Sequence, residues 1–466
     1  MTRELTKGAV LPLLIKFTIP LVLGNLFQLT YNAVDAIIVG RYVGADALAA
    51  VGVCNPVTTL MILLLNGLCI GAAVLMGTQY GKGDHETLRR QVSTTLLAGI
   101  IFSVTIAVLC IIGARPILKS LRTDPSIMDI AVRYLRIILT GLIFTFLYNF
   151  YSSTLRALGD SYTPLFFLVA SAMLNIAGDL IFVVLLHAGS DGCAVATVLS
   201  EILCCLGCSL YIRKKVPVIY IRKNELKIDR SLLKDTVSYG WASAMQQGTV
   251  QMGKIAVQAV VNTIGVAVAA AFTAVSRIDD FTYIPQQNIA HAMTAFMAQN
   301  RGAGEHRRVR EGFLKGMMLE LAYGLAVFAI CSLFAVPLMK LFIGNISQDA
   351  AGVANALTGA AGADPGAGVI SHGVAYLKLI APMYLLPAMT NGIQGYFRGM
   401  GRLKITLVSS FTNMGVRVLA AIVLVSRFGF GIEALPWSYF AGWIAMLIVE
   451  LPLLLVSLGR RKTGEQ

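Results

Sequence analysis

GKGDH at residues 81–85, followed by Arg89, recurs as GAGEH at residues 302–306, followed by Arg310. A second set of residues recurs at a slightly larger constant separation: Tyr134, Asn149, Arg156 and Gly159 match Tyr376, Asn391, Arg398 and Gly401. Two related halves, each strongly apolar, are typical of a transporter that is built from internal repeats and handles its substrate between them.

Composition indicates an all-α integral membrane protein. The chain is 56% hydrophobic and only 13% charged, whereas soluble domains carry roughly 25% charged residues. Apolar stretches of about 20 residues, the length of a spanning helix, recur between short polar breaks. We expect twelve spans, six in each half, at residues 12–39, 47–77, 91–114, 129–155, 163–187, 191–213, 235–262, 267–298, 312–342, 373–397, 404–427 and 432–458.

The net charge of +14 could indicate nucleic-acid binding. Its distribution favours a membrane topology signal, because the basic residues gather in alternate loops. The positive-inside rule then places both termini and the linker between the halves in the cytoplasm. The apolar run after the charged N-terminus is too long for a cleaved signal peptide, so we expect an uncleaved first span. The eight cysteines have no metal-ligand spacing, and packing is their expected role.

The repeats divide the chain into domains. We expect an N-terminal six-helix bundle at 1–212, a cytoplasmic linker at 213–234, and a C-terminal six-helix bundle at 235–466. The second half carries about 21 extra residues, an Ala/Gly-rich extracellular insertion at about 346–372. Its composition predicts a mobile loop, with a functional lid as the alternative. The basic linker either contacts anionic headgroups or is a solvated connector, and 229–234 is expected to form a short surface helix.

Ionisable residues inside a span are costly, so each is a functional candidate. Asp35 lies in the first span, and Asp179 lies in the fifth, four residues after Asn175 on the same helix face. An amide and a carboxylate stacked in this way suit a hard monovalent cation or a proton. If Asp35 approaches Asp179, two like charges would share one apolar pocket, as a proton-coupling site requires.

Pro20 lies in the first span, about 22 Å along the helix from Asp35. Proline removes a backbone hydrogen bond and bends a helix. The residue is therefore either a hinge that couples Asp35 to movement or a static kink.

These features together resemble the multidrug and toxic compound extrusion (MATE) family, within the wider group that includes lipid and oligosaccharide flippases. The resemblance covers nearly the whole chain, and its motifs are specific in their order and spacing rather than singly. The residues that carry it are Pro20, VD at 34–35, GKGD at 81–84, RALGD at 156–160, Asn175, Asp179 and GAGE at 302–305.

The resemblance implies two six-helix bundles and antiport, in which an organic, usually cationic, compound leaves as Na⁺ or H⁺ enters across a bacterial inner membrane. It implies a cation site in the first bundle, with Na⁺ as one candidate ion. By position, that site consists of Asp35, Asn175, Asp179 and Thr197, and Tyr134 and Asn149 join the polar network around it.

The chain departs from the NorM-like branch of this family. That branch has a glutamate in its seventh helix and an aspartate in its tenth. Here residues 244–247 read AMQQ, and the tenth span offers Asn391 but no acid. The DinF-like branch fits better, and the coupling ion is expected in the first half.

Other polar residues in the second half suggest a substrate cavity. Gln246, Gln247, Met252, Asp280 and Asn391 are the candidates for its lining, since flexible methionine surfaces accept varied ligands. Hydrogen bonds between helices are the alternative for the two glutamines. For Asp280, the alternative to a role in the cavity is a local ion pair with Arg277. Arg417 aligns with Asp179 in the repeat and is expected to pair with backbone or with Glu450. We assign no role to Glu201.

Two other classes of function fit less well. A flippase for lipid-linked sugars shares the ancestry, but it usually has fourteen helices and a cationic cavity. A membrane enzyme lacks support because the histidines have no nucleophile or metal constellation beside them. The glycine loops also lack a nucleotide-binding spacing. We therefore expect a monomeric exporter of organic cations in contact with lipid, with no cofactor other than the coupling H⁺ or Na⁺ and no nucleic-acid partner.

Overall fold

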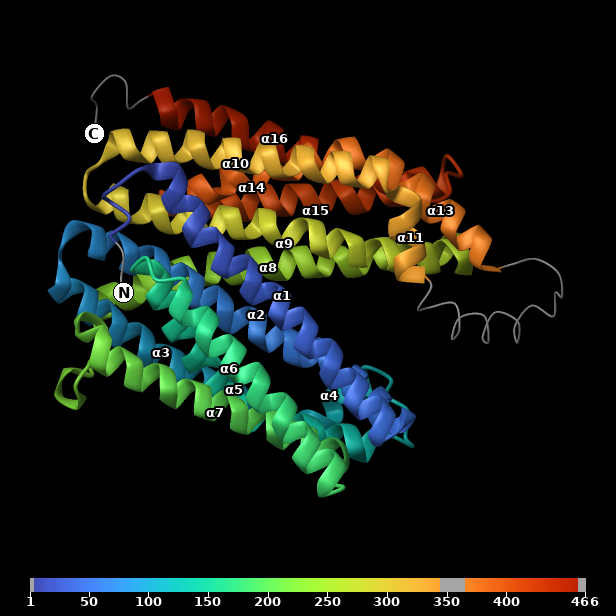
Figure 1. Ribbon diagram of the computed structural model, residues 1–466, viewed down its shortest axis with the longest axis horizontal. Coiled ribbons are helices and arrows are strands. Elements are labelled where there is room, and N and C mark those ends of the chain that lie inside the picture. The colour runs from blue at the N-terminus through green and yellow to red at the C-terminus, as the bar shows by residue number, and fades with distance from the viewer. Residues whose placement is uncertain (1–3, 344–364, 460–466) are drawn as a thin grey trace. The chain divides into compact units, whose positions relative to one another are not determined.

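The computed structural model describes residues 4–343 and 365–459, and every regular element in these two stretches is helical (Figure 1). The chain forms two compact units. Unit 1 comprises the described residues of Met1–Gly248, Ala295–Val309 and Gly399–Gly401. Unit 2 comprises those of Thr249–Thr294, Arg310–Arg398 and Arg402–Gln466.

Long helices make up the first half of the chain. They are α1 (Val10–Tyr42), α2 (Ala45–Lys82), α3 (His85–Ile112), α5 (Met128–Ala157), α6 (Tyr162–Asp179) and α7 (Gly189–Lys215). Two further long helices, α8 (Arg230–Ile264) and α9 (Val266–Gly302), follow the linker. The boundary between the units falls inside α8, after Gly248.

The remaining helices continue the second half. They are α10 (His306–Leu333), α11 (Ala335–Ile343), α13 (Pro365–Ile380), α14 (Leu385–Gly399), α15 (Leu403–Ser426) and α16 (Ala434–Gly459). Ten spans of the described chain are long and apolar enough to cross a membrane. The more polar α8 and α9 occupy the stretches of the predicted seventh and eighth spans.

Two short helices are not predicted as separate elements, and one of them, α11, divides the predicted ninth span at 312–342. The helix α4 (Ala114–Ser120) follows α3, and α11 follows α10 in the same way. Each carries a proline near its start, where the missing N–H of proline is not needed. These prolines, Pro116 and Pro337, have the same separation in the chain as Gly81 and Gly302. The repeat therefore extends to these short helices.

The predicted tenth span is confirmed as the apolar helical stretch Gly368–Gly399, but this stretch is not one continuous α-helix. A 3-10 turn at Ala381–Tyr384 separates α13 from α14. Pro382 lies in this turn and cannot donate the hydrogen bond that a continuous α-helix needs.

The insertion predicted at about 346–372 lies mainly outside the described residues. Its last part differs from the prediction of a mobile loop, since α13 begins at Pro365. The short surface helix predicted at 229–234 is also wrong as a separate element. Residues from Arg230 onward form the first turns of α8.

The glycine repeats mark a close crossing of α2 and α9 within unit 1. A Cβ on Gly81 would lie 2.0 Å from the carbonyl oxygen of Gln299, and a Cβ on Gly302 would lie 2.0 Å from that of Thr78. These contacts are equivalent under the repeat. Only glycine allows the two backbones to approach so closely. Gly83 then ends α2 in the left-handed conformation, with φ of 73°.

The linker packs on the start of α3. Arg89 donates to Glu225, and Arg90 pairs with Asp229. The hydroxyl of Ser93 donates to the carbonyl oxygens of Glu225 and Lys227, at 3.1 and 3.0 Å. The described linker is therefore held to the protein by its acidic residues and its backbone.

Candidate functional site

Three helices of unit 1 bring Asp35, Asp179 and Cys193 together. Asp35 lies on α1, Asp179 ends α6, and Cys193 lies in the first turns of α7. One carboxylate oxygen of each acid and the Cys193 sulfur all lie within 4.8 Å of one another. The two acids that the sequence places 144 positions apart therefore share one site, as predicted if α1 approaches α6.

Local backbone features make this approach of helices feasible. Gly178 precedes Asp179, and a Cβ there would lie 2.9 Å from the Cβ of Ala196 on α7. The missing side chain lets α6 and α7 pack closely. A π-helical segment, Leu180–Leu185, follows Asp179 directly. Such segments are rare and are frequent at functional sites.

Hydrogen bonds connect the site to α7. The Cys193 thiol donates to Oδ1 of Asp35 at 2.9 Å. Nδ2 of Asn175 donates to the Thr197 hydroxyl at 3.2 Å, and that hydroxyl donates to the Cys193 carbonyl oxygen at 3.1 Å. All four residues predicted for the cation site thus lie around one turn of α7.

Asp179 is fully buried, with 0% of its surface exposed. Within the described chain, neither of its carboxylate oxygens has a hydrogen-bond partner. Tyr134 of α5 is buried beside the site and interacts electrostatically with Cys193, Asp35 and Asp179. Two close carboxylates repel each other in an apolar environment. A proton or a small cation between them removes that repulsion.

The donor set suits a proton or Na⁺ better than a soft metal ion. Asp35, Asp179 and the side-chain carbonyl of Asn175 supply hard oxygen ligands. The Cys193 thiol acts as a hydrogen-bond donor to Asp35. The residues present therefore fit Na⁺ through their oxygens, with the thiol orienting one carboxylate.

No hydrogen bond between described residues joins Asn149 or Pro20 directly to this cluster, and the place of Asn149 in the polar network stays a prediction. Nδ2 of Asn149 donates to the Thr145 carbonyl oxygen of its own helix, at 2.8 Å. Pro20 is buried inside α1, which continues unbroken from Val10 to Tyr42. Its predicted role as a hinge stays a prediction.

The residues predicted to line a substrate cavity are divided between the units. Gln246 and Gln247 belong to unit 1, whereas Met252, Asp280 and Asn391 belong to unit 2. Gln246 is buried, while Met252 is 73% exposed. Their shared role in substrate binding stays a prediction.

Two predicted ionic partners in unit 2 differ from those in the structure. Asp280 pairs with Lys254 at 3.5 Å rather than with Arg277. The Arg417 guanidinium lies 3.9 Å from the ring centre of Tyr439 and 5.4 Å from that of Trp443, instead of pairing with Glu450. Aromatic faces attract a desolvated cation, and the pairing within unit 2 is decided by which helices pack together.

Two other buried acids of unit 2 each accept one hydrogen bond from a neutral hydroxyl, whereas both oxygens of the buried Glu320 have no hydrogen-bond partner among the described residues. The Tyr384 hydroxyl donates to Asp279, and the Ser409 hydroxyl donates to Glu450 at 2.7 Å. Among the described residues, neither Asp279 nor Glu450 lies in a cluster of two acids and a cysteine, as Asp35 does. The two units therefore differ in their buried charges, as the alignment of Asp179 with Arg417 indicates.

Sequence reasoning missed Cys193 and Glu201. Cysteine was assigned to packing, and no role was given to Glu201. The available signal was helical spacing, because Cys193, Thr197 and Glu201 follow one another at intervals of four and share a face of α7.

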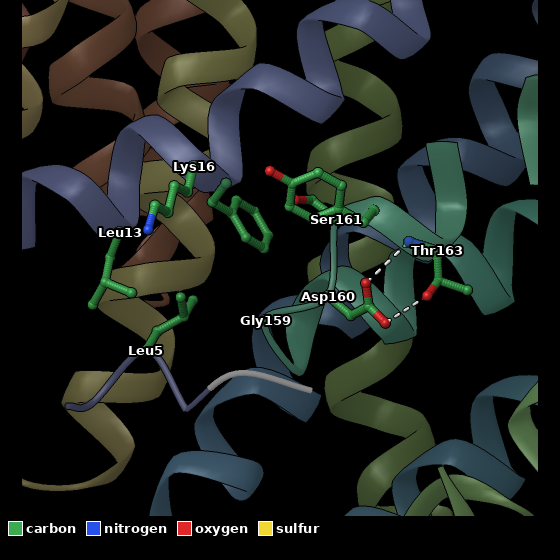
Figure 2. Close-up of a pocket in the computed structure, with 9 residues that line it drawn as sticks. Leu5, Leu13, Lys16, Gly159, Asp160, Ser161 and Thr163 are labelled. Carbon is green, nitrogen blue, oxygen red and sulfur yellow. Dashed lines mark hydrogen bonds between the residues drawn. The ribbon is translucent and has the colours of Figure 1, made fainter. Parts of the chain in front are cut away.

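A separate cavity of about 240 Å³ lies where the start of α1 meets the turn between α5 and α6 (Figure 2). Lys16 and Asp160 are among its lining residues. Both carboxylate oxygens of Asp160 accept bonds from Thr163, one from its amide at 3.0 Å and one from its hydroxyl at 2.7 Å. Asp160 therefore caps the first turn of α6, and the RALGD motif has a structural role here.

Comparison with known sequences gives a consistent result. The profile of the MatE family matches residues 20–181 and 242–423. The probable multidrug resistance protein YoeA of Bacillus subtilis (strain 168) is 30% identical over 434 residues, which cover 91% of this chain and 89% of that protein. The probable multidrug resistance protein YpnP of the same strain is 28% identical over 415 residues, covering 89% and 88% of the two chains.

Solved structures share the fold. An outward-facing multidrug resistance MATE family transporter superposes with a TM-score of 0.87 at 23% identity, covering 99% of this chain and 98% of that one. A MATE structure in the bent conformation gives 0.88, with the same identity and coverage. These likenesses confirm the predicted all-α membrane fold.

Proposed function

Because the chain belongs to the MatE family of membrane transporters, we propose that it exports organic, mostly cationic, compounds in exchange for H⁺ or Na⁺. A family of transporters also makes the chain a multi-pass membrane protein and not an enzyme. The observation that carries the proposal is the pair of carboxylates, Asp35 and Asp179, with no cationic side chain bonded to either among the described residues.

The carboxylate pair supplies a means of coupling. When a cation binds, the mutual repulsion of Asp35 and Asp179 is removed, and α1 is drawn toward α6 and α7. When it leaves, the repulsion favours separation of these helices. An ion that binds two conformations with different affinity shifts their equilibrium by that difference. Alternating access of this kind requires no cofactor other than the coupling ion.

The relatives support the proposed type of substrate. Several of them are named as multidrug resistance proteins, including YoeA and YpnP. The two acids of the site and the candidate lining residue Met252 are consistent with cationic, varied organic substrates. We propose a bacterial inner membrane, cytoplasmic termini and a monomer in contact with lipid, and the basic end of α7 at residues 213–215 supports the orientation.

The test is export from proteoliposomes under separately imposed Na⁺ and pH gradients. Asp35→Asn and Asp179→Asn should each abolish gradient-driven export without lowering the amount of folded protein, because an amide neither takes up a proton nor supplies the negative charge that compensates Na⁺. Asp129→Asn is the matched control, since this exposed acid pairs with Arg115 away from the site.

The gradient that drives export in the wild-type protein identifies the ion. Undiminished export by both amide variants would reject the proposed site. Binding of a lipid-linked pyrophosphate, with no effect of drugs, would instead support the flippase alternative.

A further inference from the structure

Glu201 is an acid of unit 1 that lies on the face of α7 packed against other helices. It is not part of the cluster of Asp35, Asp179 and Cys193. On α7 the exposed stripe consists of Leu199, Leu203, Leu206 and Leu210, which are 42–56% exposed. Glu201 is two residues from Leu199, or about 200° around the helix at roughly 100° per residue. It therefore faces away from this stripe and toward the helices packed against α7.

The surroundings of Glu201 come from α5 and α1. The Thr145 hydroxyl on α5 donates to Oε2 of Glu201 at 2.6 Å. Tyr31 on α1 interacts electrostatically with Glu201 and also with Asp35, which lies one turn further along α1. Asn149 lies one turn from Thr145 and donates to its carbonyl oxygen. Three helices thus place an acid, a phenol, an amide and a hydroxyl together.

No cationic side chain compensates this acid in the described chain. Across the described residues, the bond from Thr145 is the one hydrogen bond of Glu201, and no ion pair involves it. The next titratable groups along α7 are thiols, Cys204 and Cys205. At the linker, by contrast, the partly exposed Glu225 has Arg89 as its partner. A carboxylate within a span is costly unless a positive charge is supplied, and here the described residues supply none.

The second oxygen of Glu201 is available to a ligand. Oε1 has no hydrogen-bond partner in the described part of the chain, yet it is not one of the fully enclosed unsatisfied atoms, and the residue is partly exposed. An uncompensated acid attracts an alkylammonium or a quaternary ammonium group by charge, and the ring of Tyr31, which interacts electrostatically with Glu201, is of a kind that also attracts cations. A metal ion would prefer several oxygen ligands.

We propose that Glu201, with Tyr31, binds the positive charge of the exported compound and so makes the transporter selective for cations. The proposal rests on the proposed export function and adds a substrate subsite to it. Glu201 is outside the cluster of Asp35, Asp179 and Cys193: it lies eight residues, or about 12 Å along α7, from Cys193, and one turn from Thr197 at the edge of the coupling site.

This placement links substrate to coupling ion. Two unit charges about 12 Å apart, at an effective dielectric constant of about 20, weaken each other's binding on the order of tenfold. A cationic substrate at Glu201 therefore favours release of the cation held by Asp35 and Asp179. Tyr31 interacts electrostatically with one acid of each site, Glu201 and Asp35.

The experiment compares two substrates of the same shape, a quaternary ammonium compound and its neutral tert-butyl isostere. Glu201→Gln should weaken binding and export of the ammonium compound by about 10–100-fold, the effect of losing a bond to a charged group. The neutral compound should be handled as by the wild-type protein. Glu201→Asp keeps the charge and should retain preference for the cation.

Glu450→Gln is the matched control, because this buried acid of unit 2 also accepts from one hydroxyl. It should leave the preference for the ammonium compound unchanged. Asp35→Asn should abolish export of both compounds, which separates failure of coupling from loss of charge selectivity. Binding to the purified protein in detergent is measured in parallel, so the proposal is tested even if reconstituted export is absent. Equal losses for both compounds in Glu201→Gln, or no loss for either, would overturn the proposal.

Discussion

At the scale of single residues, the hydrogen bond from the Cys193 thiol distinguishes Asp35 from Asp179 as a ligand for a cation. Its bond occupies Oδ1 of Asp35, whereas both oxygens of the nearby Asp179 lack a protein donor among the described residues. Two acids of the same chemical type therefore differ in their surroundings. A cation entering the site competes with the S–H group for one carboxylate but not for the other.

Replacement of this thiol tests the competition. Cys193→Ala removes the donor and should lower the half-saturating concentration of the coupling cation about tenfold, since a bond to a charged group contributes about 1.5 kcal/mol or more. Cys193→Ser keeps a donor and should resemble the wild-type protein. The measurement is export rate against cation concentration. A higher half-saturating concentration in the alanine variant would show that the thiol is a ligand instead.

At the scale of helices, the crossing of α2 and α9 depends on two glycines. Gly81→Ala or Gly302→Ala places a methyl group against a backbone carbonyl that cannot move freely. Each should destabilise the protein by about 1–3 kcal/mol, the usual effect of overpacking. Thermal unfolding in detergent measures the change.

Gly248→Ala is the matched control for these glycine variants. Gly248 also lies in a helix, but a Cβ added there would have no described neighbouring atom within 4 Å. Alanine should be neutral or slightly stabilising, by up to about 1 kcal/mol. Equal melting temperatures for all three variants would show that the close crossing does not limit stability.

At the scale of the whole chain, the linker between the repeats is held by acids with altered titration. The backbone N–H of Arg222, and secondly Arg89, hold the pKa of Glu225 below its ordinary value. The backbone N–H of Leu232, and then Arg90, do the same for the pKa of Asp229. Both acids lie outside the membrane spans and are partly exposed.

These shifts predict a pH dependence of linker docking. A lowered pKa in the folded state stabilises docking fully above the unfolded-state values of about 4, and the stabilisation is lost as the pH falls through the lower folded values. Amide exchange at Lys227 and Asp229, whose N–H groups bond to Ser93 and Thr94 of α3, should therefore accelerate only in acid.

Glu225→Gln should lower this amide protection already at neutral pH and weaken its dependence on pH, because the charge is absent throughout and only Asp229 still titrates. Asp124→Asn is the control, since Asp124 bonds only locally with Ser126 among its described contacts. Protection that does not change with pH would mean that the backbone bonds alone hold the linker.

The apolar spans and the repeated glycine loops could be predicted from the sequence, because each depends on the residues of its own segment. Apolar runs of spanning length and paired glycine loops require no knowledge of neighbours, and the family profile and the helical structure confirm the membrane fold. The interruption at Pro382 was missed because proline is compatible with either a kinked helix or a break. Packing on both sides decides between them.

The candidate site was readable only in part. An acid inside an apolar span has a high free-energy cost and is therefore rare without a function. Asp35 and Asp179 could thus be chosen as site candidates from their residue type and position alone. Cys193 could not, because a cysteine in a span packs well without any polar partner. Its contact with Asp35 arises from the packing of α1 on α7.

The sequence by itself determined the membrane class, the repeat and the acids that stand out from it, because hydrophobic length and periodicity act within each segment. Only the tertiary structure decided which charges meet: Cys193 with Asp35, Thr145 with Glu201, and Arg417 with the rings of Tyr439 and Trp443. Pairing depends on distances between helices that are remote in the chain. Those distances follow from side-chain packing, including the absence of a side chain at Gly178.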